Sequence, residues 1–413
     1  MSSEKINSKR AIGLAIGAVF FLLLLVYGYG YWKWKIIEQT DSITQGRCGD
    51  ISPRFEGIVS LFESIDHQIP ESLSEAVFCP ILSYGYHFSS IIAVRRGDLY
   101  PADYYRSLGG PLFSSVESVS IHSNWKEPSL LSEIKSFRGC TELQVAGCLT
   151  FGSNEISEIE RKFPNLEKLE IATRELDWQS ILKAELETVT GLSLGVVRTS
   201  LGEPAITPAP QDDLALGLLP SLFPNLEQLV IQLEEGTTIE KLSNLPKLNH
   251  LWANTSNATP NFGKSISTIP SLDRVGVEGP SRNNPTPVDG VFQGPIASGV
   301  LELTFVYGKV DTTASAALLR KFPKIREISF KNCVVPAEFL RGLPASTNLQ
   351  NVRFSGVLVE GETCFPVPPV YLANPNFSGT AIHQKYIGER DVKFSELDDL
   401  PGLLERFDNE TRK

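Results

Sequence analysis

The chain has 413 residues, of which 42% are hydrophobic and 21% are charged, and its formal net charge is −10. This composition excludes a mostly disordered chain and supplies enough apolar residues for one large domain or two. Residues 36–413 carry 33 Lys and Arg against 47 Asp and Glu, a net charge of −14. Because phosphates are met by Lys and Arg, so acidic a chain argues against a nucleic-acid partner.

The first feature along the chain is an apolar segment over residues 11–32, which contains no charged residue. At about 1.5 Å per residue in a helix, the segment spans roughly 33 Å, enough to cross the hydrocarbon core of a lipid bilayer. Aromatic residues follow at its end, as is typical of the membrane–water boundary; they are Tyr27, Tyr29, Tyr31, Trp32 and Trp34. We therefore expect one transmembrane helix over residues 11–32.

Two other interpretations of this segment remain open. A cleaved signal peptide would begin at the basic residues Lys5, Lys9 and Arg10, but the apolar stretch is long for one and no small-x-small cleavage site follows. A buried core helix is disfavoured because the segment is apolar on all sides. Three cations precede the segment and two follow it (Lys33 and Lys35). This favours a single-pass membrane protein with a cytoplasmic tail, residues 1–10, and the remaining chain extracytoplasmic.

Gly13 and Gly17 form a GxxxG pair inside the apolar segment. Such a pair lets two helices approach closely, so it predicts a helix–helix contact and a homodimer through the membrane helix. The alternative is that two glycines occur in an apolar 20-mer by chance.

A pattern of three apolar positions, L-x-x-L-x-L, recurs through the middle of the chain. Successive copies begin 22–28 residues apart, except for one gap of 37 residues, and this range is typical of a repeat protein. The ten copies begin at Val116, Cys140, Leu166, Val189, Leu226, Leu248, Leu272, Val300, Ile325 and Leu349.

Five copies are entered through an apolar residue, Pro and a polar residue, as in Phe163-Pro164-Asn165. Proline disfavours helix in the residue before it, so it ends the preceding segment and lets a strand begin. The preceding segments 153–162 and 312–321 read as helices. One unit is therefore a strand, a turn and a helix-like return.

This pattern resembles the leucine-rich-repeat family. The fuller motif, with N or C and a further apolar residue, fits best at Ile325, Ile328, Phe330, Cys333 and Val335. The resemblance implies an α/β solenoid of about ten irregular repeats with a parallel sheet on its concave face, preceded by one transmembrane helix. The expected divisions are residues 1–10, 11–32, 33–111 (juxtamembrane segment and N-terminal cap), 112–360 (solenoid) and 361–413 (C-terminal cap and tail).

Six cysteines divide into two groups. Cys140, Cys148 and Cys333 occupy repeat positions that point into the core, where a thiol serves as a small hydrophobe. Cys48 and Cys79 lie in the proposed N-terminal cap, where they either pair in a disulfide or stay apart. Cys364 either bonds Cys333 or stays a thiol.

The sequence contains no catalytic, metal-binding or cofactor-binding motif. It has no G-x-x-x-x-G-K-[ST], no H-E-x-x-H, no G-x-S-x-G and no C-x-x-C. We expect no enzyme activity, no cofactor and no metal. Four N-x-[ST] sequons, at Asn254, Asn257, Asn376 and Asn409, matter only in a eukaryotic secretory pathway.

Strand alternation turns the residues between the apolar positions toward the outer sheet face. A Trp there is costly to expose, and Trp, Tyr and Arg dominate binding hot spots. The predicted partner-binding patch is His250, Trp252, Arg274, Tyr307 and Arg353. The alternative is that residues 254–260 fold over Trp252 and bury it.

The resemblance and the absence of catalytic motifs favour a membrane-anchored module that binds a protein partner through its concave surface. A second interpretation is a structural envelope or surface protein that self-associates. A third is an enzyme with a site in a cap or an insertion, whose mark would be a cluster of perturbed carboxylates in a deep pocket.

Overall fold

The chain folds into two compact units, residues 1–148 with 157–166 and residues 149–156 with 167–413. The computed structural model describes residues 2–44, 48–65, 71–96, 102–123, 129–176, 186–194, 197–198, 204–205, 213–233, 238–281, 284–311, 315–343, 348–360, 384–387 and 390–393. Each unit contains a row of neighbouring parallel strands.

The first unit begins with the long helix α1 (Ser2–Thr44), which contains the predicted membrane segment. Described residues 16–44 form a helix long and apolar enough to cross a membrane. The large apolar residues from Ile16 to Trp32 are exposed, whereas Ile36, Ile37 and Ile43 are buried. The N-terminal part of α1 therefore has the surface of a membrane span, and its last turns belong to the protein core.

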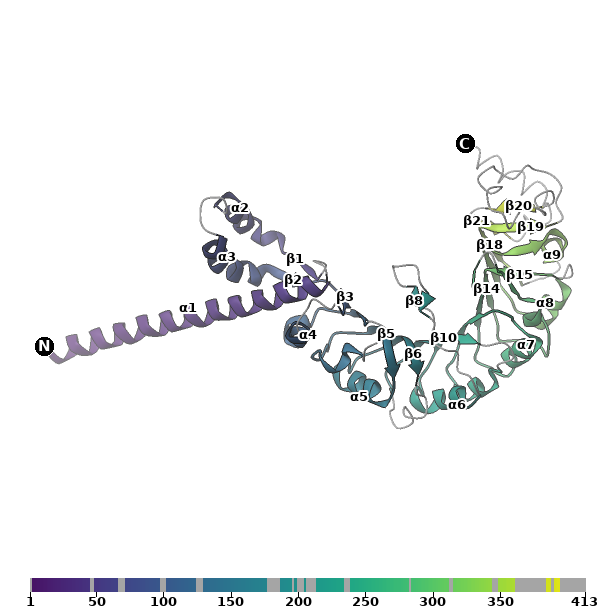
Figure 1. Cartoon of the computed structure of the whole chain (residues 1–413), viewed down its shortest axis with the longest axis horizontal. Coiled ribbons are helices and arrows are strands. Elements are labelled where there is room, and N and C mark those ends of the chain that lie inside the picture. The colour runs from purple at the N-terminus through teal and green to yellow at the C-terminus, as the bar shows by residue number, and fades with distance from the viewer. Residues whose placement is uncertain are drawn as a thin grey trace. The chain divides into compact units, whose positions relative to one another are not determined.

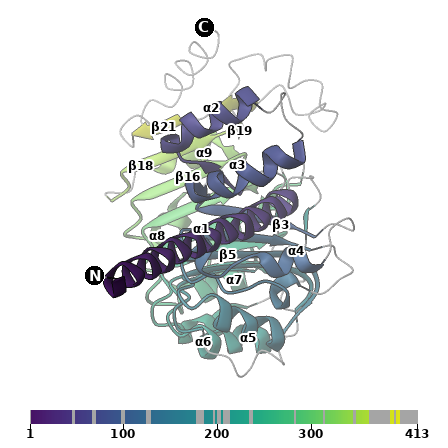
Figure 2. The ribbon, with the colours of Figure 1, turned by 90° about the vertical axis from the view of Figure 1, so that its left-hand side faces the viewer.

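Among the described residues, three further helices and five strands lie wholly or mainly in the first unit, with short 3-10 turns between them. They are α2 (Glu56–Ile65), α3 (Glu71–Gly85), α4 (Ala102–Ser107), β1 (Gly49–Ile51), β2 (Tyr86–Phe88), β3 (Ile91–Arg95), β4 (Ser118–His122) and β5 (Glu142–Phe151). α3 packs against α1 (Figures 1 and 2). β1 and β2 are antiparallel, and β3, β4 and β5 are parallel neighbours. α5 (Ser153–Lys162) contributes residues to both units.

The second unit contains a row of parallel strands that ends in one antiparallel strand. In sheet order they are β6 (Lys168–Leu176), β7 (Gly191–Leu194), β10 (Gln228–Leu233), β11 (His250–Thr255), β12 (Arg274–Glu278), β14 (Glu302–Val306), β16 (Glu327–Lys331), β18 (Asn351–Ser355) and β21 (Arg390–Lys393). The helices α6 (Asp213–Leu222), α7 (Pro260–Ile266), α8 (Ala316–Lys321) and α9 (Ala337–Gly342) lie on one side of these strands (Figure 1). We call the opposite face of the sheet, which points away from these helices, the outer face.

A second sheet of the same unit runs along the turns that follow the strands. Its members are β13 (Thr286–Pro287), β15 (Gly308–Lys309), β17 (Val334–Pro336), β19 (Val357–Glu360) and β20 (Gln384–Ile387). A separate antiparallel pair is formed by β8 (Val197–Arg198) and β9 (Pro204–Ala205).

The core confirms the register that the repeats predict. Every position of the ten apolar triples is buried, including the two looser copies that begin at Cys140 and Leu248. Stacked phenylalanines fill the space behind the sheets: Phe137 stacks on Phe163 in the first unit, and Phe305 stacks on Phe330 in the second. Burial of these side chains is the main source of stability, at about 1.5–3 kcal/mol for each large apolar residue.

The Pro-containing entry to each repeat also has a structural role. The side-chain amide of Asn165 donates to the carbonyl of Arg138 (2.7 Å), and that of Asn225 donates to the carbonyl of Glu187 (2.8 Å). The hydroxyl of Ser271 donates to the carbonyl of Leu248 (2.7 Å) in the same way. The polar residue after Pro therefore joins its repeat to the preceding one.

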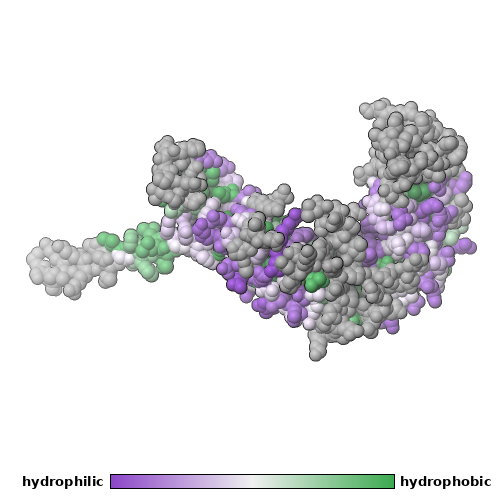
Figure 3. Space-filling view, in the orientation of Figure 1, coloured by the Kyte–Doolittle hydropathy of each residue, from purple (hydrophilic) through white to green (hydrophobic). Residues whose placement is uncertain are grey.

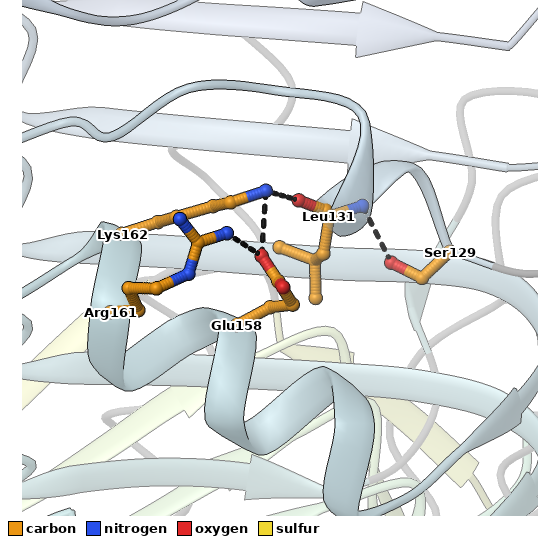
Figure 4. A network of polar contacts seen from close by, with 5 residues as sticks. All are labelled: Ser129, Leu131, Glu158, Arg161 and Lys162. Atoms are coloured by element: carbon orange, nitrogen blue, oxygen red, sulfur yellow. Dashed lines mark hydrogen bonds and ion pairs between the residues drawn. The ribbon is translucent and has the colours of Figure 1, made fainter.

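A buried lysine is the last residue of each of the helices α5 and α8. Nζ of Lys162 donates to the carbonyl of Leu131 and pairs with Glu158 at 2.7 Å (Figure 4). Lys321, whose side chain has no carboxylate contact among the described residues, donates to three carbonyls of Gly263, Gln293 and Pro295. Carbonyl oxygens near helix ends carry partial negative charge, so they stabilise an ammonium group there.

Candidate binding surface

The residues predicted to face outward, between the apolar positions of each triple, form a column that crosses the neighbouring strands in register. Val230 of β10 lies beside Trp252, Trp252 beside Gly276, and Gly276 beside Thr304. The column continues through Ser329 to Arg353, which pairs in register with Asp391 of β21. His250, Arg274 and Glu302 form the neighbouring column.

Trp252 lies partly exposed on the outer face of β11, and its ring lies over Gly276 of the next strand. A Cβ atom at Gly276 would fall 2.2 Å from the Trp252 ring, so only glycine leaves room for the indole. The indole Nε1 donates to Oε2 of Glu278 at 3.0 Å. The segment after β11, which the alternative interpretation places over Trp252, contacts β13 among the described residues. Ala258 N donates to Pro287 O, and Thr286 Oγ1 donates to Thr255 O.

His250 and Arg274 lie beside this tryptophan. The rings of His250 and Trp252 meet edge to face with centroids 6.4 Å apart. Burial, followed by the nearby Arg274 guanidinium, lowers the pKa of His250 below its ordinary value of 6.5. Arg274 itself pairs with Glu302 of β14 at 3.3 Å.

The remaining two predicted residues lie apart from this cluster. Arg353 pairs with Glu327 at 3.1 Å. It lies three strands from Arg274, which is about 14 Å at the usual strand spacing. Tyr307 is in the turn between β14 and β15, with φ 52°, where few residues other than Gly and Asn are stable. Corresponding turns have Asn332 (φ 51°) and Gly356 (φ 66°).

Sequence reasoning missed the residues that hold Trp252 in place, Gly276 and Glu278. The repeat register already places Gly276 beside Trp252, so a glycine next to an outward tryptophan was the available signal. It also missed two neighbouring acceptors, Gln232 Oε1 and Asn254 Oδ1, which are buried and have no hydrogen-bond donor among the described residues. We define the Trp252 surface as His250, Trp252, Arg274, Glu278 and Glu302, with Gln232 and Asn254 at its margin.

The recurring parallel strands, buried triples and stacked turns decide the architecture. The fold is a leucine-rich-repeat fold. Three solved leucine-rich-repeat-like structures are similar to the chain at low identity. A chain of the Drosophila Toll–Spatzle complex is 14% identical, with TM-score 0.39, and the match covers 65% of this chain and 34% of that one. The chain thus spans about a third of that relative.

The other two are human 5T4 and an internalin of Listeria monocytogenes. Human 5T4 is 13% identical with TM-score 0.35, over 63% of this chain and 84% of that one. The internalin is 12% identical with TM-score 0.30, over 78% of this chain and 73% of that one. No family model and no curated protein sequence matches the chain.

The interpretation of the protein as an enzyme can be examined at a polar cluster of the first unit, formed by Ser120, His122 and Gln144. Ser120 Oγ lies 2.8 Å from Nε2 of His122 and donates to the side-chain oxygen of Gln144. Because the Ser120 proton is directed to Gln144, His122 donates to Ser120 and does not act as its base. Burial, followed by the nearby Arg95, lowers the pKa of His122. In the described part of the chain, no group of three His, Cys, Asp or Glu side chains is placed to hold a metal ion.

The cysteines of the N-terminal cap are thiols in this structure. Sγ of Cys48 donates to Asp41 Oδ1 at 2.6 Å and lies 2.9 Å from the Tyr86 hydroxyl. Cys79 is also a buried thiol, so the disulfide that the sequence allows between them is not formed here. The Cys48 contacts instead connect the end of α1 to β2. Cys140 and Cys333 are buried thiols as well, and Cys364 lies outside the described residues.

The predicted dimer contact is described only in part. A Cβ atom at Gly17 of α1 would meet no described heavy atom within 4 Å, so that side of the helix is open. The surroundings of Gly13 lie outside the described residues. A homodimer through these glycines stays a prediction.

Proposed function

We propose that this protein is a membrane-anchored leucine-rich-repeat module that binds a protein partner through the Trp252 surface. The partly exposed Trp252, held flat against Gly276, is the observation that carries the proposal. A rigid indole flanked by an arginine and two glutamates has the composition of a binding hot spot, with an aromatic anchor and a polar rim.

The charges and acceptors around Trp252 define the partner chemistry. Glu278 and Glu302 contribute carboxylates to this surface. A partner segment that presents Lys, Arg or amide N–H groups beside an apolar residue complements this surface, because carboxylates that a partner covers need donors.

The anchor in this proposal is the N-terminal part of α1. Its exposed apolar residues from Ile16 to Trp32 support a single span through a lipid bilayer. We infer an extracytoplasmic location for the repeats from the excess of Lys and Arg before the span. The proposal assigns no catalytic activity to the protein.

The proposal is tested by isolating the full chain from its native membranes with its bound proteins. Three forms are compared: the unsubstituted chain, Trp252→Ala, and the control Ile296→Ser. Ile296 is an apolar side chain of the second unit that is 64% exposed and lies outside the sheets. We expect one protein to be retained by the unsubstituted and control chains and lost with Trp252→Ala. Equal retention by all three, with unchanged thermal unfolding, would exclude the Trp252 surface.

A further inference from the structure

Helix α3 presents an apolar face that the described structure leaves partly exposed. Val77, Ile81 and Tyr84 are 43%, 42% and 40% exposed. Their spacing of four and three residues places them on one side of the helix. Residues 76–85 contain no charged side chain, and α3 contains no Lys or Arg.

This face lies beside the apolar segment of α1. The Tyr84 hydroxyl donates to the carbonyl of Val26, and the rings of Tyr84 and Tyr29 have centroids 5.9 Å apart. Gly30 permits the close crossing, because a Cβ there would fall 2.5 Å from the carbonyl oxygen of Pro80. Helix α3 therefore crosses α1 at residues 26–30, within the segment that is predicted to span the membrane.

The crossing fixes the depth of α3 relative to the span. Residues 26–32 occupy about 9 Å of helix, so α3 lies within the last 9 Å or so of the apolar segment. That layer is where headgroups meet acyl chains and where amphipathic helices bury an apolar face. The aromatic residues Tyr27, Tyr29, Tyr31 and Trp32 are exposed at the same level, as in an interfacial belt. Figure 3 shows hydrophobic residues along the exposed part of α1 that leads to this level.

We propose that the Val77/Ile81/Tyr84 face of α3 lies in the interfacial layer of the lipid bilayer. The proposal rests on the membrane span assigned to α1 under the proposed function. Because this face is continuous with that span, lipid is the molecule that we expect to cover it. Since α3 has no cationic side chain, the contact does not require anionic lipid. The α1–α3 pair would then orient the first unit at the membrane surface, which a single helix followed by a flexible linker cannot do.

The test uses the full chain in phosphatidylcholine vesicles, with an environment-sensitive dye attached to Ile81→Cys. Leu22→Cys reports the span, and Ile296→Cys reports an exposed position outside the proposed contact. All five described native cysteines are buried, and dye uptake by the unsubstituted chain measures the background. Quenching is measured in two sets of vesicles, with spin labels placed near the headgroup to report Ile81, or near the end of the lipid chain to report Leu22 at the middle of the span. Val77→Cys repeats the measurement on the same face if Ile81→Cys unfolds.

We expect emission at shorter wavelength and strong quenching at Ile81 and Leu22, and neither at Ile296. Quenching at Leu22 without quenching at Ile81 and Val77 would overturn the proposal while leaving the anchor intact. An absence of quenching at all positions would overturn the anchor and, with it, this proposal. Dye self-quenching at Ile81 that grows with protein density, without quenching by lipid, would assign the face to a second copy of the chain and overturn the proposal.

Discussion

At the residue scale, the buried ammonium group of Lys321 is satisfied by specific backbone carbonyls. Lys321 is 2% exposed and donates to three carbonyls from preceding segments of the second unit. Its ammonium group has three N–H donors, which match the three acceptors. Burial lowers the pKa of Lys321 to about 8 from its ordinary value of 10.5.

The first prediction concerns the replacement Lys321→Met. It leaves three carbonyls without this donor, and each buried unsatisfied group costs about 1–3 kcal/mol, so we expect a clearly lower free energy of unfolding. The exposed neighbour Lys324 is the control, and Lys324→Met should have little effect. Denaturant unfolding of the three proteins measures the difference.

The pH dependence of that difference is a second prediction. Between about pH 8 and pH 10.5 the unfolded chain holds a proton on Lys321 that the folded chain has released. The free energy of unfolding contributed by Lys321 therefore rises with pH in this window, and the deficit of Lys321→Met should widen from pH 8 to pH 10. A deficit that is constant across this window would show that the lysine does not titrate with a lowered pKa.

The cysteines give a third prediction. Burial raises the pKa of the Cys48, Cys140 and Cys333 thiols to about 12. Since the thiolate is the reactive form, these three should resist iodoacetamide at pH 8 in the folded protein and react after denaturation. Mass spectrometry of the alkylated chain measures this. Native-state alkylation of Cys48 at the rate of an exposed thiol would contradict the contacts with Asp41 and Tyr86.

At the element scale, the repeat spacing predicted the parallel strands of the long sheet from β4 to β18 and the residues that face outward from it. The triples were sufficient because a period of two fixes which side of a strand is buried. The helix predicted at residues 153–162 is confirmed as α5. Strand β3, which pairs with β4 ahead of residue 112, was missed because Ser89 stands where the first apolar residue of its triple would be.

The packing of α3 on α1 was beyond sequence reasoning for a different reason. Neither helix belongs to the repeat, so no spacing relates them. The glycine pair that drew attention was Gly13 and Gly17, whereas the described helix contact uses Gly30. Likewise, Trp252, His250 and Arg274 were brought together as predicted, but Tyr307 was displaced because the chain turns toward the second sheet after β14.

A fourth prediction compares two glycines of α1. Gly30→Ala places a methyl group 2.5 Å from the backbone oxygen of Pro80, so α3 must move and the first unit should unfold at a lower temperature. Gly28 has open space around it, and Gly28→Ala should not lower the unfolding temperature, since Ala is the better helix former. Thermal unfolding of the detergent-solubilised chain measures both. Equal behaviour of the two variants would contradict the close crossing of α1 and α3.

At the scale of the whole molecule, the chain joins an apolar helix to stacked repeats with an open sheet face. The helix explains the exposed apolar residues from Ile16 to Trp32, which a water-soluble protein would rarely leave uncovered. The repeats explain the rigid outer face that carries Trp252. A membrane location would make the binding surface available on one side of the bilayer only.

The most direct test of this account is protease protection of the intact protein in sealed vesicles of known orientation, after washing at alkaline pH. We predict that the protein stays with the membrane, that the repeats are digested only from the extracytoplasmic face, and that a fragment containing residues 11–32 survives. Release of the whole chain by the alkaline wash would contradict the membrane anchor, and digestion of the repeats from the cytoplasmic face would contradict the proposed topology.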